Sequence, residues 1–187
     1  MAILPIVISG EPVLHRPAEP VTEFDAELRA FIDDMFETCE AAPGVGLAAP
    51  QVGVGKRIFV WMYGDQDEAP ERGVAINPML WISPPEPGLP EEGEEEGCLS
   101  FPGERFALRR SARALLRAQD IDGNHYELET SGWFARIMQH EYDHLNGLLY
   151  VDRLVHPESR GAQKAERKNG WGTPGLSWLP GVADLEG

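Results

Sequence analysis

The spacing of apolar residues in the first forty positions predicts an amphipathic helix. Apolar side chains recur there every three or four residues, the period of one helix face: Leu28, Phe31, Ile32, Met35, Phe36 and Cys39. Thr22 and Asp25 have the spacing of a capping box, and Pro43 with Gly44 ends the pattern. We therefore expect a helix over about residues 25–39 that buries Cys39 in the core.

Other segments have the apolar character of strands. They cover residues 57–62, 74–77, 111–119, 125–129 and 148–151. Asp122 and Gly123 lie between the third and the fourth of these segments, and this dipeptide is typical of a hairpin turn. We expect a hairpin there and an extended conformation at 148–151.

A second helix pattern covers residues 132–145. Before it, residues 83–95 contain four prolines and are expected to form an irregular, acidic loop. After it, the Gly- and Pro-rich tail at 171–181 is expected to wrap the domain through Trp171 and Trp178. Helices and strands in this order predict an α+β fold without repeats.

The composition is that of one acidic globular domain. The chain has 187 residues, 42% of them hydrophobic, and a formal net charge of −15. That charge repels nucleic acid, no apolar run reaches the length of a membrane span, and the first residues lack a signal peptide's basic region. We expect a cytoplasmic protein that binds neither DNA nor membranes. A basic group near the C-terminus is interpreted as a solvated helix face: Arg160, Lys164, Arg167 and Lys168.

The second helix ends in the pentapeptide H-E-Y-D-H at residues 140–144. His140 and His144 are four residues apart, so they share one helix face and both imidazoles can reach one metal ion. Glu141 projects beside them, where it can take a proton from a water molecule at that metal. The pattern is short, and two scattered histidines on a solvated helix are the alternative.

The two cysteines, Cys39 and Cys98, have different interpretations. Cys39 lies on the apolar face of the first helix, where a buried structural thiol is expected. Cys98 follows Gly97 in a loop segment and offers a third metal ligand, which leaves a fourth position for water, as in catalytic sites. A disulfide between them is the alternative, but a chain without a signal peptide favours reduced thiols.

Three motifs resemble those of the peptide deformylases and occur in that family's order. They are G-V-G-L-A-A-P-Q at 44–51, E-G-C-L-S at 96–100 and Q-H-E-Y-D-H-L at 139–145. The resemblance implies a catalytic domain over residues 1–154, in which small antiparallel or mixed sheets pack around the metal-bearing helix. Residues 155–187 then form an extension packed on that domain.

The resemblance implies a metal-dependent hydrolase that removes the formyl group from the N-terminal formyl-methionine of nascent peptides and releases formate. Glu141 acts as the general base. The side-chain amide of Gln51 and the backbone N–H of Leu99 donate hydrogen bonds to the oxyanion that develops at the formyl oxygen. The expected partners are N-formylmethionyl nascent peptides, with a transient ribosome contact and a monomeric enzyme.

The resemblance also indicates where the substrate binds. Its main chain would pair with backbone near Val45, Gly46 and Gly97 as an added strand. Val45, Trp133 and Ile137 match the family's wall around the methionine side chain, and ordinary core packing is the alternative for Trp133 and Ile137.

For the metal itself, a thiolate with two imidazoles suits zinc on ligand softness. The resemblance instead implies ferrous iron (Fe2+) as the working metal, with Zn2+, Ni2+ or Co2+ as substitutes. It further implies that Arg110 pairs with Glu96 and so supports the Cys98 loop.

Two other classes of protein fit part of this pattern. A zinc peptidase would take a third His or Glu ligand downstream, where His156 is the remaining histidine. A non-catalytic protein with a structural metal would need neither Glu141 nor Gln51. Formate release from formyl-Met-Ala-Ser separates both classes from a deformylase.

Overall fold

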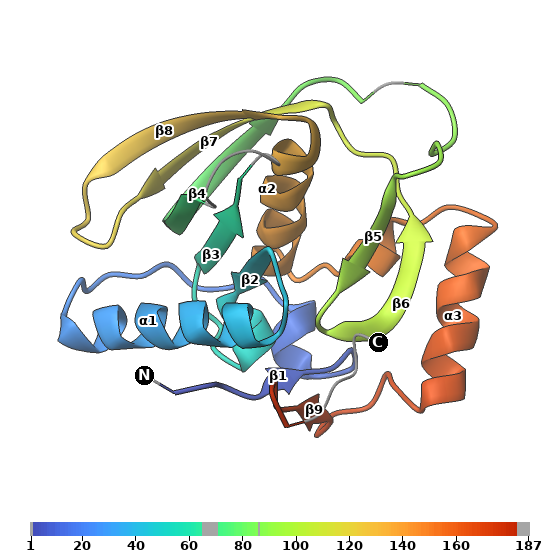
Figure 1. Cartoon of the computed structure of the whole chain (residues 1–187), viewed down its shortest axis with the longest axis horizontal. Helices are drawn as coiled ribbons and strands as arrows, with labels where there is room; N and C mark the ends of the chain where they lie inside the picture. Colours follow the sequence, from blue (N-terminus) through green and yellow to red (C-terminus); the bar gives the residue numbers. More distant parts are fainter. Residues whose placement is uncertain (1, 65–70, 86, 183–187) are drawn as a thin grey trace.

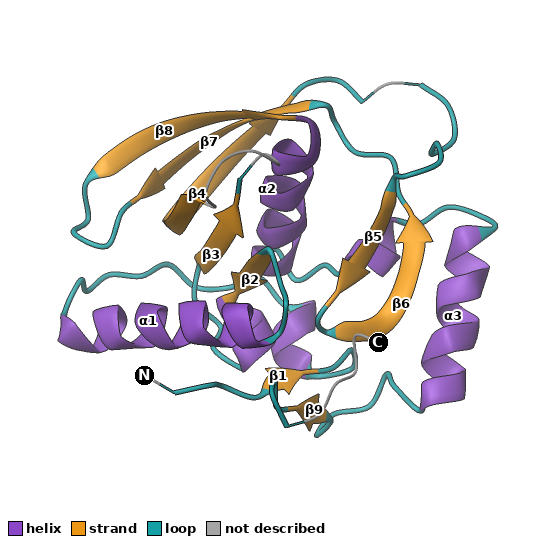
Figure 2. Cartoon of the chain, in the orientation of Figure 1, coloured by secondary structure: helices purple, strands orange, loops and turns teal. Residues whose placement is uncertain are grey.

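The computed structural model describes residues 2–64, 71–85 and 87–182. Small antiparallel sheets surround a central helix, α2 (Gly132–Leu145), as Figures 1 and 2 show. A five-stranded sheet lies on one side of α2. On the other side lie β5 (Glu95–Cys98) and β6 (Phe101–Ala107), with α3 (Glu158–Asn169) beyond them. The expected α+β fold is confirmed.

Helix α1 (Ala26–Ala41) forms where the apolar period predicts it and buries Ile32, Met35 and Cys39. Its N-cap is Asp25, whose side chain accepts a hydrogen bond from the Leu28 backbone N–H (2.9 Å). The capping box beginning at Thr22 was therefore wrong, because the Asp25 carboxylate itself satisfies the free N–H group of the first turn.

The five-stranded sheet has the order β2-β3-β4-β7-β8, and each neighbouring pair is antiparallel. Its strands are β2 (Gly46–Ala48), β3 (Ile58–Tyr63), β4 (Glu71–Ile82), β7 (Arg113–Gln119) and β8 (His125–Ser131). Strand β3 alternates between two parts of the core: Ile58 and Val60 pack with the α1 side chains, while Phe59 and Trp61 pack with those of α2. This explains why β3 is apolar at every position.

Strand β4 extends beyond the four residues predicted at 74–77 and continues through Pro78. The pairing register with β7 shifts between Ile76 and Met79, and Asn77 adopts a positive φ of 51°. This β-bulge accommodates Pro78, which has no N–H to donate. The Asn77 amide compensates by hydrogen bonding to both backbone groups of Val21.

The predicted hairpin and second helix are both confirmed. Strands β7 and β8 pair from Gln119↔His125 onward, joined by the turn that contains Asp122 and Gly123. Strand β8 passes directly into α2 at Gly132, whose φ of 56° permits the sharp change of direction. This connection places α2 across the sheet.

The extended conformation expected at 148–151 is confirmed for Leu149 but was wrong for Tyr150 and Val151, since Tyr150–Arg153 forms a 3-10 helix. The Asp152 side chain accepts a hydrogen bond from the Leu149 N–H and so stabilises the turn. Two further 3-10 helices, at Pro12–His15 and Ala49–Val52, were not predicted. The expected irregular loop is confirmed for the described part of 83–94; Glu86 lies outside the described residues.

Trp171 and Trp178 of the Gly- and Pro-rich tail pack against the rest of the chain, as expected. Trp171 contacts Phe101, with ring centroids 4.6 Å apart, and Trp178 is buried. Strand β9 (Ser177–Trp178) pairs antiparallel with β1 (Ile6–Val7), so segments near both chain ends meet. No helix within the described ranges combines the length and apolar character needed to cross a bilayer.

Candidate metal centre and active site

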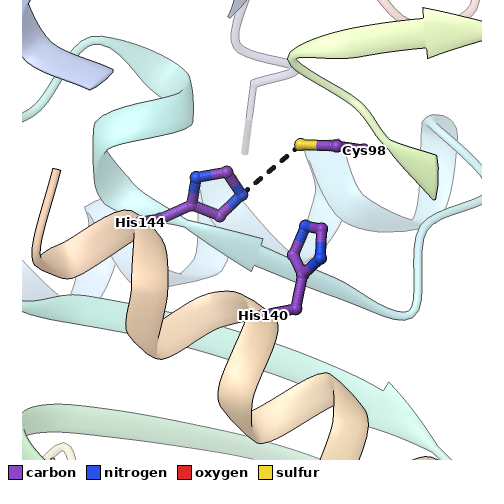
Figure 3. Close-up of side chains that lie close together, drawn as sticks. All are labelled: Cys98, His140 and His144. Atoms are coloured by element: carbon purple, nitrogen blue, oxygen red, sulfur yellow. Dashed lines mark hydrogen bonds between the residues drawn. The ribbon is translucent and has the colours of Figure 1, made fainter. Parts of the chain in front are cut away.

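Helix α2 places His140 and His144 side by side, one turn apart. Their ring centroids are 5.0 Å apart, and His144 is fully buried. Cys98 lies at the end of β5, next to this face of the helix. Its Sγ is 3.5 Å from His144 Nε2. One donor atom from each of the three lies within 4.8 Å of the others, and Figure 3 shows the side chains converging.

The carboxylate of Glu96 fixes the orientation of the His140 ring. Its Oε2 lies 3.0 Å from His140 Nδ1. A carboxylate accepts here, so Nδ1 carries the hydrogen, and the lone pair of Nε2 is left for a metal ion. Glu96 is two residues before Cys98, and this one strand therefore supplies a ligand and also orients a second one.

Two arginines hold Glu96 in turn. Arg110 makes two hydrogen bonds to it, both 2.8 Å, and a third of 2.6 Å to Asp143. Arg136 donates to Glu96 (2.8 Å) and to the Leu108 carbonyl (2.6 Å). The predicted Arg110–Glu96 pair is confirmed. The sequence did not predict the contributions of Arg136 and Asp143. They could have been suspected because both are charged residues within the apolar helix pattern of α2.

These contacts set the charges of the site. Burial would raise the pKa of Glu96, but hydrogen bonds from Arg110 and His140 hold it well below its ordinary value. Burial lowers the pKa of His144 strongly, so this imidazole is neutral. Burial also disfavours protonated His140, but Cys98 and Glu96 outweigh it and raise the pKa of His140 well above its ordinary value. In the metal-free chain this favours protonated His140, and a metal ion bound at Nε2 would take the place of the proton there.

Glu141 is 4% exposed and lies against the backbone of Gly46 in β2. A Cβ atom at Gly46 would collide with the Glu141 carboxylate, so the glycine makes room for it. Burial raises the pKa of Glu141 to about 7. Its Oε2 has no hydrogen-bond partner within the described part of the chain. A buried carboxyl group of this kind is suited to exchanging a proton with a small molecule.

The side chain of Gln51 is buried and its amide has a defined orientation. Its Oε1 accepts a hydrogen bond from the Ala48 N–H (2.8 Å), which places Nε2 toward Cys98, 3.6 Å from Sγ. The amide N–H groups therefore point to the site, and an oxygen forming there would find a donor.

A cavity of about 210 Å³ opens onto this cluster. It is lined by ten of the residues predicted for the site or its ligands: Val45, Gly46, Gln51, Gly97, Cys98, Leu99, Trp133, Ile137, His140 and Glu141. The eleventh, His144, is fully buried and is not among the residues that line the cavity. Arg105 also lines the cavity, although the sequence did not predict it there. His156 is exposed and lies outside the ligand cluster.

The donor set fits a divalent ion of the borderline-soft class. One sulfur and two imidazole nitrogens are the ligands of many catalytic zinc and iron sites. Glu141, whose Oε2 has no hydrogen-bond partner among the described residues, lines the same cavity. Three ligands beside a buried carboxyl group and an amide donor define a metal-dependent hydrolase of carbonyl compounds.

Comparison with known proteins identifies the family within this class. Residues 3–160 match the family model of polypeptide deformylase. The peptide deformylases of Rhodococcus opacus and Mycolicibacterium smegmatis are 49% and 50% identical to the chain, over 98% and 97% of it and 96% of each relative. The chain therefore belongs to the peptide deformylase family.

The fold agrees with this relationship. The peptide deformylase of Synechococcus elongatus, solved in complex with actinonin, superimposes with a TM-score of 0.80 at 35% identity, covering 92% of each chain. As a member of the family, the chain is a metal-dependent hydrolase that removes the formyl group from the N-terminal formyl-methionine of nascent peptides.

Proposed function

We propose that this chain deformylates peptides with Cys98, His140 and His144 as metal ligands and Glu141 as the proton-transferring group. The observation that carries the proposal is the convergence of the three donor atoms within 4.8 Å beside a buried carboxyl group with a free oxygen. A divalent ion bound there supplies Lewis acidity, which acidifies water and polarises the formyl carbonyl group.

The proton follows a short path through Glu141. This carboxylate accepts a proton from the attacking water, and the oxygen adds to the formyl carbon. Glu141 then returns the proton to the amine nitrogen as the C–N bond breaks, which releases formate and a free N-terminus. A pKa of about 7 suits both steps, because a group with this pKa gains and loses a proton with nearly equal ease near neutral pH.

Gln51 Nε2 and the Leu99 N–H donate to the formyl oxygen as it becomes negative. The support is that both residues line the cavity and that the Gln51 amide is held with its nitrogen toward Cys98. Donors fixed in advance need no reorganisation during the reaction, and removing one such donor typically costs about 10²–10³-fold in kcat.

The substrate main chain binds between β2 and β5. Each strand is at the edge of its sheet and has one free side, and Gly46 and Gly97 line the cavity there. An extended peptide can add to such an edge. The methionine side chain enters between Val45, Trp133 and Ile137. Trp133 and Val45 are 40% and 45% exposed, which is consistent with surfaces that a ligand covers.

The metal that works in the cell is ferrous iron, with Zn2+, Ni2+ or Co2+ as substitutes. Air oxidises a thiolate next to iron when solvent reaches it. Cys98 is only 4% exposed, but it lines the open cavity. Protein prepared in air is expected to lose activity and to carry zinc or oxidised Cys98. Cys39 should stay unoxidised, since burial raises the pKa of its thiol to about 12. Metal analysis with peptide mapping of both cysteines tests this, and equal, oxygen-insensitive activity of zinc- and iron-loaded protein would contradict it.

The protein works in the cytoplasm as a monomer, with residues 1–154 as the catalytic domain and 155–187 as a packed extension. It meets its substrate during a transient contact with the ribosome. The net charge of −15 opposes binding to nucleic acid in general, apart from this ribosome contact.

Formate release from formyl-Met-Ala-Ser, followed by mass spectrometry, tests the proposed function. The metal-replete protein should remove the formyl group and leave every internal peptide bond intact. Actinonin, which occupies the Synechococcus elongatus enzyme, should compete with the peptide. An unchanged peptide, or cleavage inside it, would show that the assignment is wrong.

A further inference from the structure

The loop that carries Cys98 and Leu99 is anchored by a sheet made from both ends of the chain. Strands β1 and β9 pair with Ile6 opposite Trp178. Next to β1, the Ser9 N–H donates a hydrogen bond to the Ser100 carbonyl (2.8 Å). From β9, the Trp178 indole Nε1–H donates to the Leu99 carbonyl (2.9 Å). Two consecutive carbonyl groups of the loop are therefore held by one small sheet.

The bond from Trp178 to Leu99 lies in the core. The two residues are 6% and 8% exposed and belong to the same hydrophobic cluster, although 79 positions separate them. A buried carbonyl that loses its donor is left without any partner, because water cannot reach it, and this is unfavourable. The carbonyl of Leu99 is therefore held strongly in one direction.

The direction of this carbonyl bears on the reaction, because Leu99 also carries the N–H proposed to stabilise the formyl oxygen. Backbone has two soft dihedral angles per residue. Leu99 follows the proposed metal ligand Cys98 directly in the chain. On its other side, its own carbonyl is held by Trp178. With both flanks held, the Leu99 N–H has little freedom to turn away from the cavity.

We propose that Trp178 is a positioning residue for deformylation: its indole N–H fixes the Leu99 carbonyl and thereby keeps the Leu99 N–H aimed at the formyl oxygen. The inference rests on the proposed role of Leu99. It assigns the C-terminal segment a part in catalysis, although the family model matches the chain only as far as residue 160.

Trp178→Phe removes the donor and keeps an aromatic ring in the core. Trp171→Phe is the matched control, since Trp171 lies in the same tail, packs on Phe101, and makes no indole hydrogen bond within the described ranges. With metal content verified, Trp178→Phe should lower kcat roughly tenfold with KM changed less than about twofold, a smaller loss than removal of a donor. Trp171→Phe should leave kcat within about twofold.

Trp178 replaced by β-(3-benzothienyl)alanine provides a variant of nearly identical shape, with sulfur in place of the N–H, should Trp178→Phe fold poorly. It should show the same loss of kcat. In zinc-loaded protein, NMR should show a shifted amide resonance for Ser100, whose nitrogen shares a peptide unit with the Leu99 carbonyl. The Trp171→Phe variant should leave that resonance in place.

The outcomes separate the inference from the proposed function. Wild-type kcat with an unshifted Ser100 resonance overturns the anchoring of Leu99 by Trp178. Wild-type kcat with a shifted resonance shows that the anchoring exists and that the N–H of Leu99 has no catalytic part. Equal losses in the Trp178 and Trp171 variants overturn the specific role of the indole N–H. Failure of the function itself would instead appear as no formate release by the wild-type protein.

Discussion

Three local features of Glu141 support its proposed role in proton transfer. It is buried, its pKa is raised to about 7, and one of its oxygens has no partner among the described residues. The neighbouring glycine, Gly46, is what permits this position, because the carboxylate fills the space that a side chain would take. The roles of Glu141 and Gly46 can each be tested by a single substitution.

Glu141→Gln should keep the metal and lose most of the activity. The amide has nearly the shape of the carboxylate but cannot accept the proton, and one acid–base group contributes roughly 10²–10⁴-fold. The measurement is kcat at saturating formyl-peptide together with metal content per chain. Full activity in the metal-replete variant would mean that another group is the base.

Gly46→Ala should lower kcat by about 10²-fold while the protein still folds. The added Cβ collides with the end of a flexible side chain, so the clash is relieved by moving Glu141, and a displacement of about 1 Å can cost that much. Gly55→Ala is the control, because a Cβ there meets only Val13 at 3.7 Å. Wild-type kcat in Gly46→Ala would show that Glu141 need not lie where it does.

At the scale of elements, the site joins β5 to α2 through buried charges. Glu96 on β5 connects His140 and Arg136 on α2, and Arg110 connects Glu96 to Asp143. The side chains of Glu96, Arg110 and Asp143 are at most 5% exposed. Burying such charges is costly, so their value lies in fixing where β5 lies relative to the helix.

Glu96→Gln should destabilise the protein by about 3–5 kcal/mol at pH 7, because it leaves buried arginines short of a partner. Glu127→Gln is the control: its pair with Arg117 is about half exposed and should contribute about 0–1 kcal/mol. Denaturant unfolding of the metal-free proteins measures both. A loss no larger than that of Glu127→Gln would contradict the structural role of the charge cluster.

Glu96→Gln also tests how stability depends on pH. The pKa of Glu96 is lower in the folded chain than its ordinary value of 4.5, so its stabilisation is present above that value. It is lost as the pH falls below 4.5 toward the folded-state pKa. Wild-type stability should therefore decline more steeply with acid than that of Glu96→Gln. Parallel curves would show that Glu96 is not held ionised.

At the scale of the whole molecule, the site lies where four distant parts of the chain meet. Cys98 lies 46 residues before His144, Gln51 lies 47 residues before Cys98, and Trp178 contacts Leu99 from near the C-terminus. A metal held between β5 and α2 binds only the folded arrangement. Its binding energy is therefore added to the stability of the fold.

Metal removal should lower Tm. Free metal at 100 times its Kd stabilises the folded state by about 2.7 kcal/mol, which corresponds to roughly 5–10 °C for a domain of this size. Cys98→Ala should abolish most of this shift, while Cys39→Ala, at a buried core position, should retain it despite a lower baseline Tm. Calorimetry with and without chelator makes the comparison. A shift preserved in Cys98→Ala would place the metal elsewhere.

Some of these features could be predicted from the sequence by itself, because they depend on neighbours within a few positions. The period of apolar residues gave helix α2 with its bounds at Gly132 and Leu145. The four-residue spacing of His140 and His144 determines that both rings share a face, and the apolar face of α1 determines the burial of Cys39. The motifs also indicated which residues would line the cavity.

Only the tertiary structure decided how these pieces meet. The contact of Glu96 with His140, the second arginine at Arg136 and the bond from Trp178 to Leu99 join residues 40 or more positions apart. No local periodicity encodes such pairs, since they follow from the packing of sheets on a helix. The bulge at Asn77 belongs here too: the strand predicted at 74–77 continues past Pro78, and the hydrogen bonds of Asn77 to Val21 stabilise this continuation.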